Sequence, residues 1–157
     1  MFFIWIIVVL GIAVFYIRRY RIAPTLKQAE VDCVLYNGGK AVIRPGGGKW
    51  VLIAYWQSWC GPCRQEIDRL AWWIGSRGGE IEIWFVTDED NAAVRDIAGR
   101  QEYDGLRFVQ SVKSLHDLGV YTYPTNYIYD PSGREILKRA GEVTENELES
   151  LIKTKNN

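Results

Sequence analysis

The sequence predicts an α/β domain with a central mixed sheet and helices on both faces, preceded by one N-terminal transmembrane helix. Three observations support this prediction. Strand-like and helix-like segments alternate along most of the chain, residues 50–56 form a continuous apolar run rich in β-formers, and residues 2–17 carry no charged side chain. Alternating strands and helices are typical of layered folds, and a continuous apolar run is typical of a strand buried on both faces.

Length and composition narrow the choice of protein class. The chain has 157 residues, 48% of them hydrophobic, which suits one globular domain with a short extension. Its 19 basic and 19 acidic side chains give no net charge. A general nucleic-acid binder usually carries a basic excess, so no nucleic-acid partner is predicted. Three cysteines are too few for a disulfide-stapled scaffold.

The apolar N-terminal run predicts a membrane anchor. As a helix, residues 2–17 would cover roughly 24 Å, somewhat less than the hydrocarbon core of about 30 Å. No basic residue precedes the run and arginines follow it, unlike a cleaved signal peptide. The alternative, a buried core helix, is disfavoured because the segment has no polar face. We predict an anchor over 1–21 that contacts lipid through residues 2–17, a linker over 22–30 and a globular domain over 31–157.

The first half of the domain indicates a hairpin, a central strand, a helix and another strand. Asn37-Gly38-Gly39 is a strong turn signal between two short β-rich runs. Gly75 and the Gly78-Gly79 pair end the helical pattern. The expected bounds are 31–36 and 40–44 for the hairpin, 50–56 for the central strand, 60–74 for the helix and 81–87 for the next strand.

The second half indicates a helix, short elements, a second hairpin and a last helix. Alanines with Val94 and Ile97 supply an inner helical face. Asp130-Pro131-Ser132-Gly133 is a turn between two strands. Thr144 with Glu147 three residues later forms a capping box. The expected bounds are 91–102 for the helix, 107–110 for a strand, 114–118 for a short helix, 126–129 and 135–140 for the hairpin and 144–153 for the last helix.

Trp59-Cys60-Gly61-Pro62-Cys63 carries the predicted chemistry, because it follows a buried strand and opens a helix. Unpaired N–H groups and the positive end of the helix dipole favour a thiolate there, and the thiolate is the reactive form of cysteine. A second cysteine within one turn can close a disulfide with the first. Proline is tolerated in a first helical turn.

This arrangement predicts thiol–disulfide exchange. Cys60 would attack a disulfide in a partner protein, and Cys63 would then attack Cys60 and release the reduced partner. The reverse order would oxidise a dithiol. Cys33, Cys60, Cys63 and His116 are four possible zinc ligands, but nothing in their spacing brings them together. We predict no metal and no cofactor beyond the redox-active Cys60–Cys63 pair.

Residues 50–152 resemble the membrane-anchored TlpA-like and ResA-like branch of the thioredoxin superfamily, through W-C-G-P-C and the order of the surrounding stretches. The resemblance implies a thioredoxin-like fold and a thiol–disulfide oxidoreductase that reduces protein substrates. It also implies that Tyr123-Pro124 belongs to a loop with a cis-proline that docks the substrate chain. With Trp59, Gly61 and Pro62, these two residues are the predicted substrate-binding set.

Glu66 matches an acidic residue that follows the second cysteine in the ResA-like branch. The resemblance implies that it accepts or relays the proton of Cys63, as the third predicted catalytic residue; the alternative is a solvated helix carboxylate. The sequence also departs from thioredoxin, since Ala54 stands where thioredoxin has a buried acid and Asp68 where it has a proline. Cys33 lies in a predicted strand and is either a buried apolar residue or a third redox thiol.

The rival function is a binding module that holds a partner protein or copper through the two thiols without turnover. An enzyme of this kind needs an upstream dithiol electron donor, which would be a membrane reductase or a thioredoxin system. The anchored branch typically faces the extracytoplasmic side of a bacterial-type inner membrane, and we expect that side. The arginines at 18, 19 and 21 favour the cytoplasmic side instead.

Overall fold

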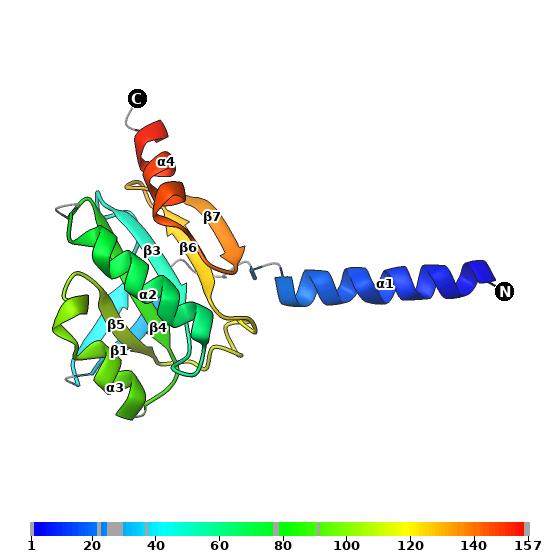
Figure 1. Cartoon of the computed structure of the whole chain (residues 1–157), viewed down its shortest axis with the longest axis horizontal. Coiled ribbons are helices and arrows are strands. Elements are labelled where there is room, and N and C mark those ends of the chain that lie inside the picture. The colour runs from blue at the N-terminus through cyan, green and yellow to red at the C-terminus, as the bar shows by residue number, and fades with distance from the viewer. Residues whose placement is uncertain are drawn as a thin grey trace.

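A computed structural model describes residues 2–21, 23–24, 30–36, 38–76, 79–90 and 92–155, with the side chains of the first helix described for residues 4–15. The described chain forms a sheet covered by helices and loops, from which the N-terminal helix projects (Figure 1). The helices are α1 (Phe2–Arg21), α2 (Gly61–Ile74), α3 (Ala92–Ala98) and α4 (Glu145–Lys155), with a short 3-10 turn η1 (Gln101–Tyr103).

Within the described ranges, seven strands form one mixed sheet in the order β2-β1-β5-β4-β3-β6-β7. Strand β4 pairs in parallel with β3 and with β5, and every other pairing is antiparallel. The mixed sheet predicted from the sequence is therefore confirmed. The strands are β1 (Val31–Leu35), β2 (Lys40–Ile43), β3 (Trp50–Tyr55), β4 (Ile81–Thr87), β5 (Arg107–Ser111), β6 (Thr125–Tyr129) and β7 (Glu135–Ala140).

Strand β3 lies between β4 and β6, and all six of its residues are buried. Its uninterrupted apolar sequence fits this place, because a central strand meets packed side chains on both faces. The strand is followed by the short loop that ends at Cys60, the N-cap residue of α2. A fully buried strand thus supports the predicted reactive segment.

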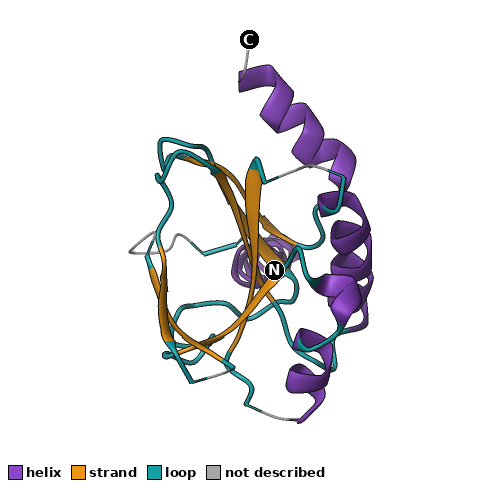
Figure 2. Cartoon of the chain, turned by 90° about the vertical axis from the view of Figure 1, so that its left-hand side faces the viewer, coloured by secondary structure: helices purple, strands orange, loops and turns teal. Residues whose placement is uncertain are grey.

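The three domain helices α2, α3 and α4 all lie on one face of the sheet (Figure 2). Their inner side chains join one hydrophobic cluster, which includes Ile67, Val94 and Leu148. The described residues that cover the opposite face are not helical; they include Leu115, Val120 and Ala23. The prediction of helices on both faces is therefore wrong for the described residues, because loops and turns rather than a helix cover the second face there.

Two predicted helices also end earlier or do not form. The helix expected over 91–102 stops at Ala98, and Gly99 separates it from the η1 turn. The helix expected over 114–118 is one turn closed by a bond from the Leu118 amide to the Ser114 carbonyl (3.2 Å). Gly119 follows with φ +82°, a left-handed conformation that ends the turn.

Two predicted turns and caps have the expected geometry. The Glu147 amide donates to Thr144 Oγ1 (3.3 Å) and the Thr144 amide donates to Glu147 Oε2 (3.1 Å), so the capping box forms. In the β6–β7 hairpin, Asp130 Oδ1 accepts from the amides of Ser132 (2.9 Å) and Arg134 (3.0 Å). Gly133 adopts φ +85° in this turn.

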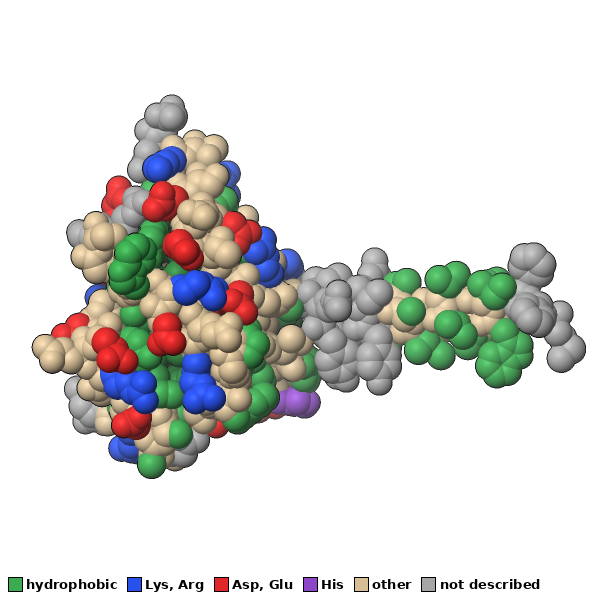
Figure 3. Space-filling model, in the orientation of Figure 1, with side chains coloured by type: hydrophobic (Ala, Val, Ile, Leu, Met, Phe, Trp, Pro, Cys, Tyr) green, Lys and Arg blue, Asp and Glu red, His purple; other side chains and the backbone are tan. Residues whose placement is uncertain are grey.

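Helix α1 is apolar over the part whose side chains are described, and its large apolar side chains between residues 4 and 15 are 47–69% exposed (Figure 3). Among the residues that the structure describes, no helix is long and apolar enough to cross a bilayer. The predicted transmembrane segment is thus not confirmed; the side chains of residues 2, 3, 16 and 17 lie outside the described set.

The described part of the predicted linker packs on the domain. Ala23 is buried, and the Tyr127 hydroxyl donates to the Pro24 carbonyl oxygen (2.6 Å). Residues 22 and 25–29 of this linker lie outside the described residues. The chain therefore contacts the sheet two positions after α1 ends.

Candidate active site

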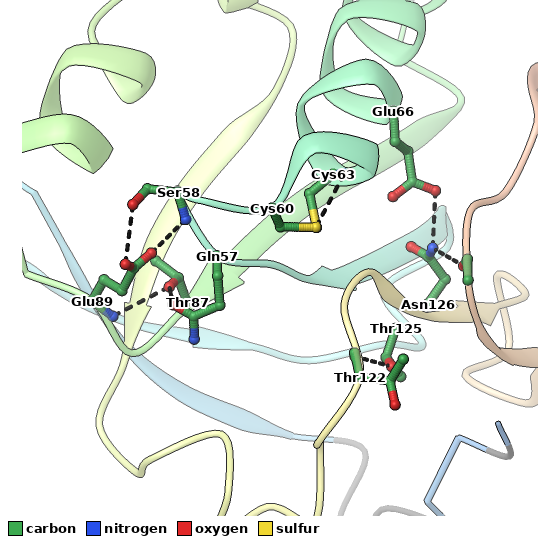
Figure 4. Close-up of a disulfide and its surroundings, with 11 residues drawn as sticks. Gln57, Ser58, Cys60, Cys63, Glu66, Thr87, Glu89, Thr122, Thr125 and Asn126 are labelled. Carbon is green, nitrogen blue, oxygen red and sulfur yellow. Dashed lines mark hydrogen bonds between the residues drawn. A yellow bond between two sulfur atoms is a disulfide. The ribbon is translucent and has the colours of Figure 1, made fainter. Parts of the chain in front are cut away.

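The two cysteines form a disulfide at the start of α2, with Cα atoms 5.3 Å apart (Figure 4). Cys60 is the N-cap residue, and its Sγ accepts a hydrogen bond from the Cys63 amide (3.2 Å). The orphan N–H groups of the first turn therefore face the first sulfur, as the sequence predicted. Cys60 retains 4% exposure whereas Cys63 has none, so an external sulfur reaches Cys60 first.

The predicted substrate-binding residues come from two segments, the one that contains the cysteines and the loop before β6. Trp59 is 69% exposed, and its ring packs edge-on against Tyr123, with centroids 5.9 Å apart. The Tyr123–Pro124 peptide bond is cis, which agrees with the resemblance. Gly61 and Pro62 are exposed in the first turn of α2. The structure thus brings the WCGPC segment and the proline loop together, while their roles in substrate binding stay predictions.

Glu66 is fully buried beneath the first turn of α2 and is not a solvated helix carboxylate. Its Oε1 accepts from the Val143 amide (2.6 Å) and from Asn126 Nδ2 (2.9 Å). Burial raises the pKa of this carboxyl to about 7, although both hydrogen bonds act in the opposite direction. A group that titrates near neutral pH can both accept and release a proton, which is the chemistry that the resemblance implies.

Sequence reasoning missed two residues that hold the reactive loop. Glu89 accepts at Oε2 from the Ser58 amide (2.5 Å) and at Oε1 from the Ser58 hydroxyl (3.0 Å). Asp88 accepts at Oδ1 from Gln57 Nε2 (2.7 Å) and at Oδ2 from the Leu115 amide (2.8 Å). The acidic run at the end of β4 therefore ties down the loop before Cys60, and the only sequence signal was its place at a strand end.

The other candidate ligands lie apart from the disulfide. Cys33 packs in the cluster on the sheet face opposite α2, and burial raises its pKa to about 12. The His116 ring packs edge-on against Tyr121. In the described portion of the chain, no three metal-binding side chains gather at one point.

Comparison with known proteins gives the family. The thiol-disulfide oxidoreductase ResA of Bacillus thuringiensis subspecies konkukian is 30% identical over 124 residues, which cover 74% of this chain and 69% of ResA. The chain belongs to the ResA-like thiol–disulfide oxidoreductases of the thioredoxin superfamily. This ResA-like oxidoreductase is also 33% identical over 108 residues to the thiol:disulfide interchange protein HelX of Rhodobacter capsulatus, over 67% of the chain and 60% of HelX.

Solved structures of other proteins have the same fold as this chain. The thioredoxin domain of a thiol-disulfide oxidoreductase from Bacteroides vulgatus superposes with a TM-score of 0.65 at 17% identity, covering 86% of this chain and 98% of that one. StoA of Bacillus subtilis superposes with a TM-score of 0.57 at 18% identity, covering 82% and 99%. No known family profile matches the chain. The thioredoxin-like fold and the oxidoreductase activity predicted from the sequence are thus confirmed.

Proposed function

We propose that this ResA-like oxidoreductase reduces disulfides in protein substrates by cycling Cys60 and Cys63 between dithiol and disulfide. One observation carries the proposal: Cys60 caps α2 and is the more exposed of the two sulfurs, while Cys63 is fully buried behind it. This asymmetry assigns attack on the substrate to Cys60 and release of the product to Cys63.

The cycle begins with the Cys60 thiolate, which attacks one sulfur of the substrate disulfide. A Cys60–substrate bond forms, and the other substrate sulfur leaves as a thiolate. Cys63 then attacks Cys60, the internal disulfide forms, and the second substrate sulfur leaves. Two electrons have passed from the cysteine pair to the substrate. An upstream dithiol donor, a membrane reductase or a thioredoxin system, restores the pair by the same exchange.

Glu66 is the proposed proton acceptor for Cys63. Cys63 is fully buried, so its thiolate is costly to form unless a nearby group takes the proton. Glu66 lies three residues further along α2, on the same helical face. One of its carboxyl oxygens, Oε2, accepts no hydrogen bond from the described residues, and burial raises the pKa of the carboxyl to about 7. Glu66 can therefore take up a proton near neutral pH.

The exposed rim forms the proposed substrate surface. Trp59 and Tyr123 supply an aromatic pair beside the sulfurs, and Gly61 and Pro62 present a first turn with little side-chain bulk. Pro124 itself is buried behind Tyr123, and its carbonyl oxygen accepts from the Gly141 amide (2.8 Å). Its proposed part is therefore to hold Tyr123 at the rim. An extended polypeptide that places its disulfide over Cys60 fits this surface.

We also propose that α1 anchors the domain in a bacterial-type inner membrane, with the domain on the extracytoplasmic side. The support is the apolar surface of residues 4–15, whose large side chains make no core contacts, since lipid would cover a surface of this kind. A fixed redox domain suits substrates that a diffusing thioredoxin does not reach. C-terminal reporter fusions test the side, and activity of a cytoplasm-only reporter would reject it.

Insulin reduction tests the enzymatic proposal. The wild-type protein should reduce insulin with a dithiol donor, and Cys60→Ser should lose that activity completely. Cys63→Ser should instead accumulate a mixed disulfide with the substrate. Cys33→Ser is the matched control, because this third cysteine lies on the opposite side of the sheet. Retained turnover in the Cys60→Ser variant would reject the assignment and leave the thiol-binding module as the alternative.

A further inference from the structure

Asn126 is a fully buried polar residue of β6 whose side chain meets the first turns of α2. Its Nδ2 donates to Glu66 Oε1 (2.9 Å) and to the Gly141 carbonyl oxygen (2.9 Å). One amide group therefore joins α2 to the segment that follows β7. Sequence reasoning treated this position only as the start of a strand.

The two oxygens of the Glu66 carboxyl have different surroundings. Oε1 holds two N–H donors, from Asn126 and from Val143. Oε2 is buried and makes no hydrogen bond to any residue that the structure describes, and the same holds for Asn126 Oδ1. In Figure 4 both of these oxygens point toward the side of the disulfide. Oε1 therefore already accepts two hydrogen bonds, whereas Oε2 can still bind a proton.

The sheet register explains how the two side chains fit. Asn126 pairs with Ala54 across the antiparallel β3–β6 ladder, and residues directly opposite in such a ladder point to the same face. Ala54 is fully buried and carries only a methyl group. A larger side chain at 54 would fill the space beneath α2 that Glu66 and Asn126 now share.

We propose that Asn126 is a positioning residue for Glu66: it fixes one carboxyl oxygen and leaves the other to exchange a proton with Cys63. The inference rests on the proposed function of Glu66. In the resolving step, the Cys63 thiol gives its proton to Oε2 and attacks Cys60, so the Cys60–Cys63 bond forms as the Cys60–substrate bond breaks. The electron pair of the broken bond leaves on the substrate sulfur, which takes up a proton in turn.

The groups around Glu66 determine in which direction its pKa should move when Asn126 is replaced. Burial raises the pKa of Glu66 most, the bonds from Val143 and Asn126 lower it, Glu142 raises it and Arg69 lowers it. Arg69 also pairs with Glu142 (2.6 Å) and with Glu145 (3.8 Å) at the edge of the site. Helix α2 thus contributes Arg69 as well as Cys63, and Ala54 adds no charge from β3. Loss of the Asn126 bond should therefore move the Glu66 titration to higher pH.

The test uses Asn126→Ala with two measurements. In the first, the reduced full-length protein reacts with dithionitrobenzoate, and the rate at which the second thionitrobenzoate is released reports the resolving step. This rate is measured between about pH 5 and 9. The titration of the Glu66 carboxyl carbon is followed by ¹³C NMR in the oxidised protein. We expect the resolving step to slow about tenfold at neutral pH, the size expected for one hydrogen bond to a charged group, and the titration to move upward.

Three variants complete the design. Tyr127→Phe loses the hydroxyl bond to Pro24 on the other side of the same strand and should change neither measurement. Glu66→Gln should be slow, and adding Asn126→Ala to it should slow it no further. Asn126→Asp keeps the size of the side chain and should also move the titration upward, because it sets a like charge beside Glu66.

An unmoved Glu66 titration in a folded Asn126 variant would overturn the proposal. So would a further tenfold loss when Asn126→Ala is added to Glu66→Gln, because Asn126 would then act without Glu66. The NMR titration needs no substrate. Failure of insulin reduction would therefore reject the proposed function without deciding this inference.

Discussion

Replacing Glu66 with Gln should stabilise the oxidised protein at alkaline pH and leave its stability unchanged at acidic pH. The carboxyl has a pKa of about 7 in the folded chain, against 4.5 for an ordinary glutamate. Between these values the folded state binds the proton that the unfolded state has lost. The stability that Glu66 contributes is therefore fully present below about pH 4.5 and is lost as the pH rises through about 7.

The magnitude follows from that interval. At about 1.36 kcal/mol for each pH unit, the difference between 4.5 and about 7 corresponds to about 3 kcal/mol. Gln is neutral at every pH, and its oxygen can keep the two bonds from Val143 and Asn126. Its new N–H₂ group would take the place of Oε2, which accepts no hydrogen bond from the described residues. The substitution should therefore mimic the protonated acid.

Urea unfolding of the oxidised wild-type and variant proteins, at about pH 4.5 and pH 8, measures the effect. The difference in unfolding free energy between variant and wild type should rise by up to about 3 kcal/mol over this range. Glu80→Gln, at an exposed position, is the control and should show no such rise. A difference that stays constant or falls with pH would refute the reasoning, because the carboxylate would then be no costlier folded than unfolded.

Three further predictions concern other parts of the domain. Glu89→Gln replaces the charged acceptor of the Ser58 amide and should cost about 1 kcal/mol of thermal stability, with a severalfold loss in kcat/KM for insulin. Gly133→Ala should cost about 1–2 kcal/mol in urea unfolding, because the position has φ +85° and a Cβ there would lie 3.2 Å from the Pro45 carbonyl oxygen. Native reduced protein at about pH 8 should take up iodoacetamide at the more exposed cysteine of the pair, Cys60, but not at Cys33, whose pKa burial raises to about 12. Mass spectrometry identifies the modified thiols, and rapid native labelling of Cys33 would contradict its burial.

The sequence was most informative where the signal is local. The apolar run of β3, the capping box at Thr144 and the helix start at Cys60 depend on residues within a few positions of one another. The order of strands and helices along the chain also follows from the alternation of apolar patterns. These features could be predicted because backbone hydrogen bonding and turn chemistry are decided over short stretches.

The missed features depend on contacts between distant segments. Asn126 and Glu66 are 60 positions apart, and neither residue type by itself indicates full burial. Ser58 and Glu89 likewise meet only because β3 and β4 end at the same edge of the sheet. The helix expected at 114–118 did not form, so the second face of the sheet has loops where the alternation predicted helices.

The docking of Ala23 and Pro24 limits how far the reactive sulfur can travel. Helix α1 ends at Arg21, and two positions later the chain is already fastened to the sheet. A long flexible linker would let the domain move over a wide radius around α1. The attachment at Ala23 and Pro24 instead keeps the domain close to the end of that helix. With α1 held in a membrane as proposed above, a client protein would have to reach the domain at the membrane surface. The local concentration of clients there, rather than diffusion of the domain, would then set how often Cys60 meets a disulfide.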